Sequence, residues 1–584
     1  MKKQWIAMLT TLLMILPVAG LGAESEIEAN TLFVGGVIYT VDAEDTIAQA
    51  LGVKDGRIIF VGSDEEAAAW QGADTQVIDL EGRFMMPGLI DSHIHSIMPS
   101  FFDFDLLGIP TLEGTMDAIA AYIAENPNKD DYNGFGYMTN IFTGDELDKG
   151  PRKERLDEIC PDKPLGILSF DGHTLWANTK YFEVYGITYD TQSPKGGIVE
   201  KDDEAKDVWG TLKDAASALG NPEPYDHDIL QTELPTFLST LNSYGYTAIM
   251  TLPAYGTMPI PFEAYRALED AGQLTMRVHG ATSFMDFRWE DDLARMIETK
   301  EKYDSDLVKM STAKFFMDGV VDTRTAYLLE PYADVDSLGM AGWETETLSE
   351  VYTKVNEAGF QIHTHAIGDG ALRMSLDAME YARDNTPEGD YRNAITHLQV
   401  VDAADIPRLG ELGIVAVTQP FWHYKAPEYW DVVEYAALGE RAEHMYPMKS
   451  FLDSGAVITA SSDYPVTPDP NPFVAMELGV TRNLPGNAEE LMAYGIEPIS
   501  DMDDPTWLLW PEERLTIQDM IRAYTVNGAY LLFSEDETGT LEVGKQADLI
   551  ILDRNLLEVD PLEIHTIQVL ATFLGGEMVY MAEE

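Results

Sequence analysis

The sequence predicts an α/β fold, a TIM-like (β/α)8 barrel with an inserted subdomain and a small composite β-sandwich domain from both chain ends. Three observations support this. Eight short apolar segments alternate with helix-like segments, as parallel barrels require. The gap between the first two, about residues 96–243, is too long for a loop and predicts the insertion. Finally, β-meander patterns occur only at the two chain ends.

The first residues have the layout of a secretory signal. Lys2 and Lys3 precede an apolar run from Trp5 to Val18, and small residues follow it. The run is too short to favour a permanent span, so we expect a signal peptide over residues 1–23 and a periplasmic or secreted protein. An uncleaved membrane anchor is the alternative. The sole cysteine, Cys160, excludes an intrachain disulfide.

The composite domain is expected over residues 24–87 together with 539–584. Near the amino end, LFVGGVIYTV and ALGVKDGRIIFVG read as short strands separated by Gly and Asp turns. The same pattern returns only in GTLEVGKQADLIILD and VLATFLGGEMVYM, near the carboxyl end. The two ends are therefore expected to fold together, with the barrel, residues 88–538, between them.

The eight barrel strands are expected in segments rich in β-branched and apolar residues, several of them preceded by helix-like stretches that end in glycine. These are FMMPGLIDSHIH and the ranges Gly245–Leu252, Leu274–Thr282, Ser311–Gly319, Gly359–Asp369, Asn393–Val400, Gly413–Pro420 and Ala456–Pro465. The active site of such a barrel lies at the carboxyl ends of its strands.

The composition limits the partners. The chain has 100 acidic and 38 basic residues, a formal net charge of −62. This surface repels nucleic acid and anionic lipid, so we expect a small-molecule substrate. An acidic, hydrated surface that keeps the protein soluble in a salty medium accounts for the charge. A homodimer is left open as an assembly state.

Polar residues gather at the predicted strand ends. His93 and His95, at i and i+2, project from one strand face, although two histidines alone are weak evidence for a metal. Further strand-end residues are His363, His365, His397 and Asp463, with Lys314 inside the fourth strand. Together they could hold one or two divalent cations. Of the pair in the fifth strand we choose His365 as the ligand and expect His363 to be packed behind the site.

Lys314 needs a separate interpretation, because a buried ammonium is costly and tends to lose its proton. A neutral amine can react with carbon dioxide to form a carbamate that bridges two metals. The alternative is an ion pair of Lys314 with Asp318 or Asp322.

These motifs together resemble the amidohydrolase superfamily, in particular its amidohydrolase-3 branch of YtcJ-like metal-dependent hydrolases. The similarity covers nearly the whole mature chain and is carried by PGLIDSHIH, HTLWAN, KFFMDGVVDTRTAYLLEPY, HAIGDGA, ITHLQ, TQP, SSDYPV, LTIQDMIRAYTVNGAYLLF and GTLEVGKQADLIILD. The resemblance implies one or two metals, usually zinc. It assigns the ligands as His93, His95, Lys314, His365, His397 and Asp463. One departure is Thr396, where the family commonly has Glu.

The expected reaction is hydrolysis of a C–N bond, in an amide or cyclic amide, by a metal-activated water with Asp463 as general base. His173 is expected to bind the substrate or its tetrahedral intermediate, and Trp176 to wall the pocket. Arg324 either orients an anionic substrate group or pairs with Asp322. Gln419 is also expected among the substrate-binding residues, in loop positioning more than in catalysis. Ester or lactone hydrolysis, deamination and a non-catalytic exported binding protein are the alternatives.

Overall fold

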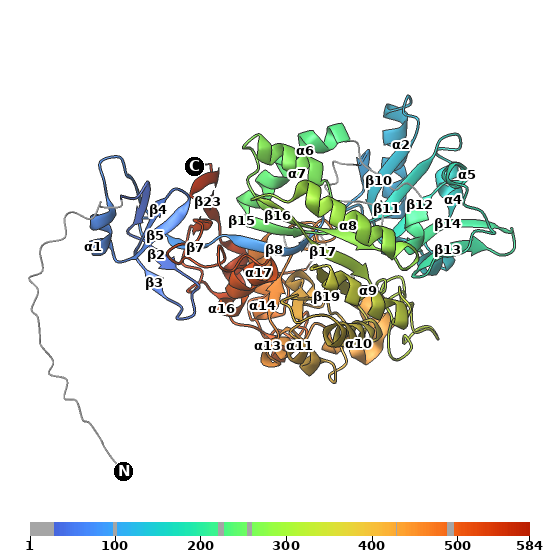
Figure 1. Cartoon of the computed structure of the whole chain (residues 1–584). Helices are drawn as coiled ribbons and strands as arrows, with labels where there is room; N and C mark the ends of the chain where they lie inside the picture. Colours follow the sequence, from blue (N-terminus) through green and yellow to red (C-terminus); the bar gives the residue numbers. More distant parts are fainter. Residues whose placement is uncertain are drawn as a thin grey trace, which may run out of the picture.

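The computed structural model describes residues 28–96, 102–219, 227–253, 260–427, 429–486 and 496–583. Figure 1 shows three parts in a row: a β domain that holds both chain ends, the barrel in the middle, and the inserted subdomain on the far side. The signal peptide predicted over residues 1–23 lies outside the described residues. No helix in the described ranges has the length and apolar content needed to cross a membrane.

Eight parallel strands form the barrel sheet, in the order of the chain. They are β8 (Leu89–Ile94), β15 (Tyr246–Thr251), β16 (Arg277–Phe284), β17 (Val308–Phe316), β18 (Gln361–Ala366), β19 (Ala394–His397), β20 (Val415–Thr418) and β21 (Ile458–Ala460). Six lie within the segments predicted to be strands, and β16 and β17 overlap theirs, β16 ending two residues later and β17 beginning three residues earlier, so the fold class is confirmed. The first and last strands meet where Asp463 N–H donates to the His93 carbonyl and His95 N–H to the Tyr464 carbonyl, both at 2.9 Å.

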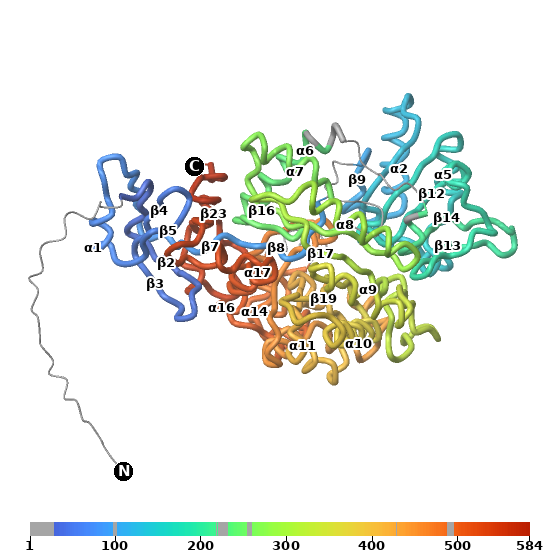
Figure 2. Tube along the Cα trace, in the orientation of Figure 1, coloured from blue at the N-terminus to red at the C-terminus, as the bar shows by residue number. Residues whose placement is uncertain are grey.

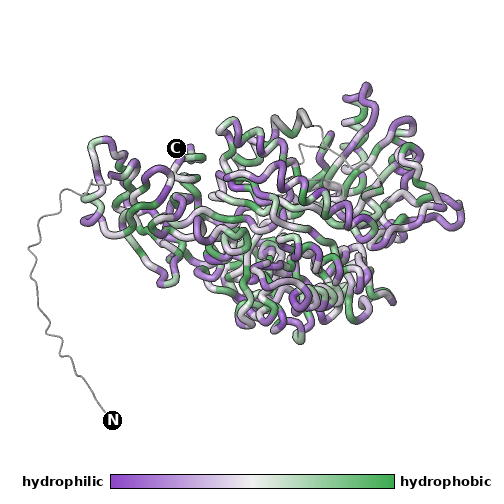
Figure 3. The backbone as a smooth tube through the Cα atoms, viewed as in Figure 1, coloured by the Kyte–Doolittle hydropathy of each residue, from purple (hydrophilic) through white to green (hydrophobic). Residues whose placement is uncertain are grey.

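Helices cover the barrel because each has one apolar face. They include α6 (His227–Ser243), α7 (Phe262–Asp270), α8 (Trp289–Tyr303), α9 (Thr345–Glu357), α10 (Asp369–Asn385), α11 (Ile406–Leu412), α13 (Met448–Asp453), α14 (Pro472–Thr481), α16 (Ile517–Tyr524) and α17 (Val526–Leu531). In α9 the buried residues Leu348, Val351 and Val355 recur at helical spacing. Figure 3 accordingly shows hydrophobic stretches inside the molecule and hydrophilic ones on peripheral loops.

Helix α6 falls within the range predicted for the insertion, yet it packs on the barrel. Its buried residues Leu234, Phe237, Leu238 and Leu241 belong to the same apolar cluster as the barrel strands. Fully burying side chains of this kind contributes roughly 1.5–3 kcal/mol each. The structured part of the insertion therefore precedes α6.

Strands from both chain ends share one sheet. It has the order β24-β23-β22-β7-β2-β3, and its strands are β2 (Val37–Tyr39), β3 (Ile47–Ala48), β7 (Phe84–Pro87), β22 (Leu549–Leu552), β23 (Val569–Leu574) and β24 (Glu577–Met581). The colours of Figure 2 show the blue and red segments side by side, as the antiparallel pairing of Leu549 with Pro87 requires. A second sheet, β5-β4-β1-β6, consists of β1 (Thr31–Val34), β4 (Ala50–Lys54), β5 (Arg57–Gly62) and β6 (Gln76–Asp79).

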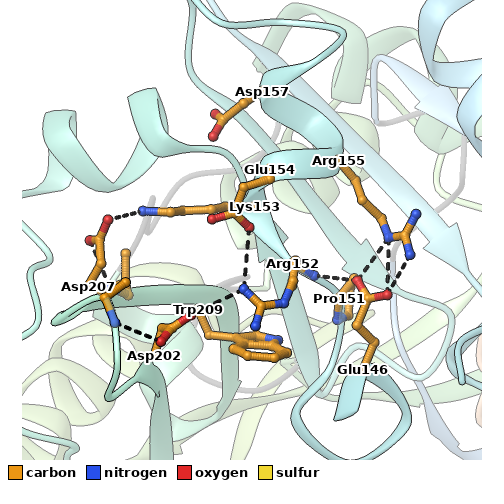
Figure 4. Close-up of polar contacts among 12 residues, drawn as sticks. Glu146, Pro151, Arg152, Lys153, Glu154, Arg155, Asp157, Asp202, Asp207 and Trp209 are labelled. Atoms are coloured by element: carbon orange, nitrogen blue, oxygen red, sulfur yellow. Dashed lines mark hydrogen bonds and ion pairs between the residues drawn. The ribbon is translucent and has the colours of Figure 1, made fainter. Parts of the chain in front are cut away.

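The inserted subdomain is built on a six-stranded sheet of order β13-β14-β12-β11-β10-β9. Its strands are β9 (Phe104–Asp105), β10 (Tyr132–Tyr137), β11 (Leu165–Ser169), β12 (Thr174–Ala177), β13 (Gly197–Asp202) and β14 (Asp207–Asp214). Figure 4 shows how ion pairs tie the segment around Arg152 to the β13–β14 hairpin. The Arg152 guanidinium lies 3.2 Å from Asp202 and 3.6 Å from the centroid of the Trp209 ring. Lys153 forms an ion pair with Asp207, which lies in the same hairpin. These contacts fix strand β14, whose last residue reaches the barrel mouth.

Candidate metal centre

Three donors meet at the carboxyl end of the barrel. Asp463 Oδ1 lies 3.4 Å from His93 Nε2 and 3.0 Å from His95 Nε2, and all three side chains are buried. Their ligand atoms lie within 4.8 Å of one another. His93 and His95 come from β8 and the turn after it, and Asp463 follows β21, so the two strands that close the barrel supply this group.

The His95 ring has a defined tautomer. Its Nδ1 lies 2.9 Å from the Leu252 carbonyl oxygen, which can only accept a hydrogen bond. Nδ1 therefore carries the proton, and the lone pair of Nε2 faces Asp463. His93 Nδ1 lies 3.0 Å from His363 Nε2, which places His363 behind His93. Burial lowers the pKa of His93 well below its ordinary value, and the positive charge of Lys314 lowers it further, so this imidazole is neutral.

Two further histidines lie across the barrel mouth. The ring centroids of His365 and His397 are 4.5 Å apart. His365 Nε2 lies 3.1 Å from the Gly319 carbonyl oxygen, which accepts its proton. His397 Nδ1 lies 3.0 Å from Gln419 Oε1. Each ring thus has one nitrogen held by the protein and the other left as a possible donor to a metal.

Lys314 lies between the two groups. Its Nζ is 3.3 Å from His93 Nε2 and 4.8 Å from the centroid of the Phe316 ring, and the residue is fully buried. Burial lowers the pKa of Lys314 to about 7, against the opposing effect of Asp463. In the described ranges no carboxylate lies within 4.0 Å of Nζ. The predicted alternative, an ion pair with Asp318 or Asp322, is therefore wrong.

His173 reaches the barrel mouth from the inserted subdomain. Its ring centroid lies 5.1 Å from that of His365, and its Nδ1 lies 2.8 Å from Asp214 Oδ1, at the end of β14. Burial lowers the pKa of His173, but the hydrogen bond and charge of Asp214 outweigh this and raise the pKa above its ordinary value. Gly319 leaves room for the Asp214 side chain, because a Cβ at position 319 would lie only 2.7 Å from Asp214 Oδ1.

Comparison with known proteins agrees with this arrangement. Residues 76–580 match the profile of the amidohydrolase family. The chain belongs to the amidohydrolase family. It is 28% identical to a putative amidohydrolase, YtcJ, of Bacillus subtilis over 94% of this chain and 98% of the relative. It is 24% identical to an N-substituted formamide deformylase of Arthrobacter pascens over the same shares.

A solved structure has the same fold. An uncharacterised metal-dependent hydrolase from Pyrococcus horikoshii superposes with a TM-score of 0.65 at 22% identity, over 91% of this chain and 99% of its own. This amidohydrolase is a metal-dependent hydrolase. The donor set fits a divalent metal, because imidazole nitrogens and a carboxylate oxygen are its common ligands. Asp463 Oδ1 is moreover buried and accepts no regular hydrogen bond from the described residues.

Two buried aspartates that the sequence analysis did not place in the site hold the amidohydrolase ligands in position. Asp91 accepts hydrogen bonds from the N–H groups of His93 and Ser462, at 3.1 Å each. Asp318 accepts from three N–H groups, among them those of Ile367 and Gly368 that follow His365. Burial raises the pKa of Asp91 to about 7 and that of Asp318 to about 8. Asp91 could have been recognised from the sequence, because it is a carboxylate two residues before His93 in an apolar strand.

Gln419 positions a ligand of the amidohydrolase site. Its Nε2 donates to Thr396 Oγ1 at 3.0 Å and to Ser461 Oγ at 2.8 Å, so its Oε1 is the atom that faces His397. Gln419 is fully buried, which agrees with positioning and not with the predicted contact to substrate. Thr396, the departure from the family pattern, thus holds the residue that orients His397.

Two residues predicted to bind substrate make structural contacts. Trp176 is fully buried in the subdomain core against Tyr137 and Phe142, and its Nε1 donates to the Arg152 carbonyl. Its position in the middle of β12 explains this, because that face of the strand points into the core. Arg324 forms an ion pair with Asp334 at 2.6 Å and donates to the Asp322 carbonyl oxygen. The prediction that Trp176 walls the pocket is therefore wrong, and the ion pair of Arg324 is with Asp334 and not with Asp322; a contact of Arg324 with substrate stays a prediction.

A cavity of about 360 Å³ adjoins the centre. Trp422, which stacks on His397 with ring centroids 5.5 Å apart, forms part of its wall. Most of the lining is aromatic or aliphatic. Its acidic residues are Asp171, Asp322 and Glu434, and no lysine or arginine of the described chain lines it. This space is the place for a substrate beside the metal.

Proposed function

We propose that this protein hydrolyses the C–N bond of a small amide or cyclic amide, with Asp463 as the general base. The observation that carries the proposal is the position of Asp463 Oδ1, within 3.4 Å of both histidines of the metal pair and at the barrel mouth. The formamide deformylase among the relatives supports a C–N bond as the target. Ester or lactone hydrolysis and deamination on the same site are the competing reactions.

A bound divalent metal would lower the pKa of a water and polarise the substrate carbonyl. Asp463 accepts the proton of the attacking water and returns it to the leaving nitrogen. His173 acts in the same reaction on the oxygen of the substrate carbonyl. With Asp214 on its Nδ1, the protonated ring can donate its Nε2–H to the oxygen on which negative charge develops.

The cavity restricts the substrate. Its aromatic and aliphatic walls favour an apolar substituent on the amide. Glu434 is 5% exposed and accepts a hydrogen bond from Gln399, while among the described residues no lysine or arginine forms an ion pair with it. Burial raises the pKa of Glu434 to about 8 and that of Asp322 to about 7, so these two side chains hold little negative charge near neutral pH. We therefore expect the part of the substrate bound here to be uncharged, because a carboxylate would find no cation in the lining.

We propose zinc as the metal and a carbamate on Lys314 as the bridge between two ions. Histidine-rich donor sets favour zinc among the abundant divalent cations. The support for the carbamate is the buried Lys314 amine with its lowered pKa and without a carboxylate partner. Elemental analysis tests both: zinc at two per chain, falling to one in the Lys314→Met variant, is expected. Two metals in the variant would contradict the bridge.

Export remains a proposal from the sequence of residues 1–23. We expect the protein in the periplasm or medium, with its amino terminus near residue 24. Fractionation of the source cells followed by amino-terminal sequencing checks this, and a cytoplasmic protein that retains Lys2 and Lys3 would contradict it.

The function is tested with the mature protein loaded with zinc. The panel contains N-benzylformamide, a cyclic imide, a γ-lactone, an aryl ester and an aminopurine, with release of amine, acid and ammonia measured separately. We expect amine release from an amide, and none in Asp463→Asn. Faster turnover of the lactone or the purine would replace the proposed C–N hydrolysis by lactone hydrolysis or deamination. A metal-free protein without any turnover would favour the non-catalytic binding protein.

A further inference from the structure

A second cavity lies at the opposite end of the barrel from the metal centre. It has a volume of about 400 Å³. It is formed by the amino-terminal ends of β16, β17 and β18 and by the end of α17, and its lining includes His279, Lys300, Lys309, Ser311, Phe360 and Phe533. None of the proposed metal ligands takes part in it.

This cavity has a positive charge without a counter-charge. His279 and Lys309 are register partners on β16 and β17, so their side chains project from the sheet on the same side. In the described chain, no carboxylate lies within 4.0 Å of Lys309 Nζ, whereas Lys300 is paired with Asp304 at 2.9 Å. The one acidic residue of the lining, Asp390, is engaged by Arg392.

His279 is a buried side chain of the lining; its Nδ1 has no surface open to the cavity, so a ligand would meet the remaining edge of the ring. The residue is only 9% exposed, and its Nδ1 is buried without a hydrogen-bond partner among the described residues. Burial lowers the pKa of His279 to about 3, with a further contribution from Lys309. The imidazole is thus neutral and keeps one N–H to donate.

The rim of the cavity is apolar. Phe533 is 42% exposed, although it lies against the guanidinium of Arg392, which is 4.5 Å from its ring centroid. Phe360 lines the same cavity, with Lys300 Nζ 5.7 Å from its ring centroid. The cavity therefore joins a polar, positively charged floor to aromatic walls, which suits a ligand with an anionic group on an organic body.

We propose that this cavity binds a small aromatic oxyanion, with the anionic group on Lys309, His279 and the Ser311 hydroxyl, and the ring against Phe360 and Phe533. A phosphate ester, a sulfonate and a carboxylate share this chemistry. Charge-assisted hydrogen bonds to Lys309 would supply most of the specificity. The site is independent of the hydrolytic reaction and of the metal.

Calorimetry on the zinc-loaded mature protein tests the proposal with phenyl phosphate as the probe. We expect one molecule bound per chain, about tenfold or more weaker binding in Lys309→Gln and in His279→Phe, and unchanged binding in Lys302→Gln. Lys302 lies on the exposed side of α8 and outside the cavity, so its variant makes the same change in net charge. Zinc content and circular dichroism verify that each variant is folded.

Further probes separate the parts of the proposed ligand. Benzoate and benzenesulfonate are expected to bind, inorganic phosphate more weakly than phenyl phosphate, and benzyl alcohol not at all. The proposal is overturned if phenyl phosphate does not bind the wild-type protein, if Lys302→Gln weakens it as much as Lys309→Gln, or if benzyl alcohol binds equally well.

Discussion

The two sides of the metal centre are built differently. On one side, β8 and β21 place His93, His95 and Asp463 within 4.8 Å of one another, a set of donors that is already assembled. On the other side, the ring nitrogens of His365 and His397 are held by Gly319 and Gln419. The two sides meet at Lys314 and where the rings of His93 and His397 approach, with centroids 5.0 Å apart. The first side alone can bind one ion, whereas the second depends on Lys314 and on residues that orient the rings.

This difference follows from how the barrel closes. Asp91 and two backbone hydrogen bonds lock the end of β8 to the segment after β21, so the first three donors share one rigid unit. On the far side His365 and His397 lie on β18 and β19, and each ring is oriented by its own partner, Gly319 after β17 and Gln419 after β20. A variant on the first side is therefore expected to affect the whole centre, and a variant on the second only half of it.

The largest effect is expected for Asp463→Asn. Loss of the carboxylate removes the proposed base and one oxygen donor, so kcat/KM should fall by about 10⁴-fold, comparable to the loss of a proton-transfer group. Steady-state kinetics with the best amide measure it, and unchanged circular dichroism shows an intact fold. Activity within tenfold of wild type would remove Asp463 from the mechanism.

Replacement of one histidine on each side tests the asymmetry directly. His95→Ala should leave the protein close to free of metal, while His365→Ala should retain the ion of the first side. Elemental analysis after dialysis gives both stoichiometries. Equal metal loss in the two variants would show that the two sides form a single unit.

Loss of the hydrogen bond from His397 to Gln419 is expected to reduce metal affinity less than loss of a metal ligand does. Gln419→Leu leaves His397 Nδ1 without its acceptor, so metal affinity on the far side should weaken by about 10- to 100-fold. Competition with a chelator measures the affinity. Gln419→Glu retains the acceptor and should restore it; failure of that rescue would assign Gln419 to packing alone.

The smallest effect concerns pH. Asp214 raises the pKa of His173, whose protonated form is present below that pKa and is lost as the pH rises through it. Asp214→Asn should therefore move the alkaline limb of the kcat/KM profile to lower pH. Asp190→Asn, at an exposed position of the inserted subdomain outside β14, makes the same change of side chain as a control and should leave the profile in place. An unmoved limb in Asp214→Asn would separate His173 from the reaction.

The barrel and its rim could be predicted because strand periodicity fixes them. Once His93 and His95 lie on a parallel strand, Asp463 must meet them at the same end of the barrel. Trp176 and Arg324 could not be placed in this way: a tryptophan mid-strand and an arginine in a loop have no periodic signal that separates a pocket wall from a core or a local ion pair. Asp91 and Asp318 were missed because the sequence alone does not show that an aspartate in or after a strand is buried and accepts backbone N–H groups.

The pairing of β7 with β22 has a consequence for folding. Leu549 is the partner of Pro87, so more than four hundred residues separate two neighbours in one sheet. Contacts of such separation form late, because a long stretch of chain must close first. Strand β8, which carries the first two histidines, directly follows β7. A truncation that removes β22 would thus leave the start of the barrel unanchored, and the metal centre would be among the last parts of the protein to mature.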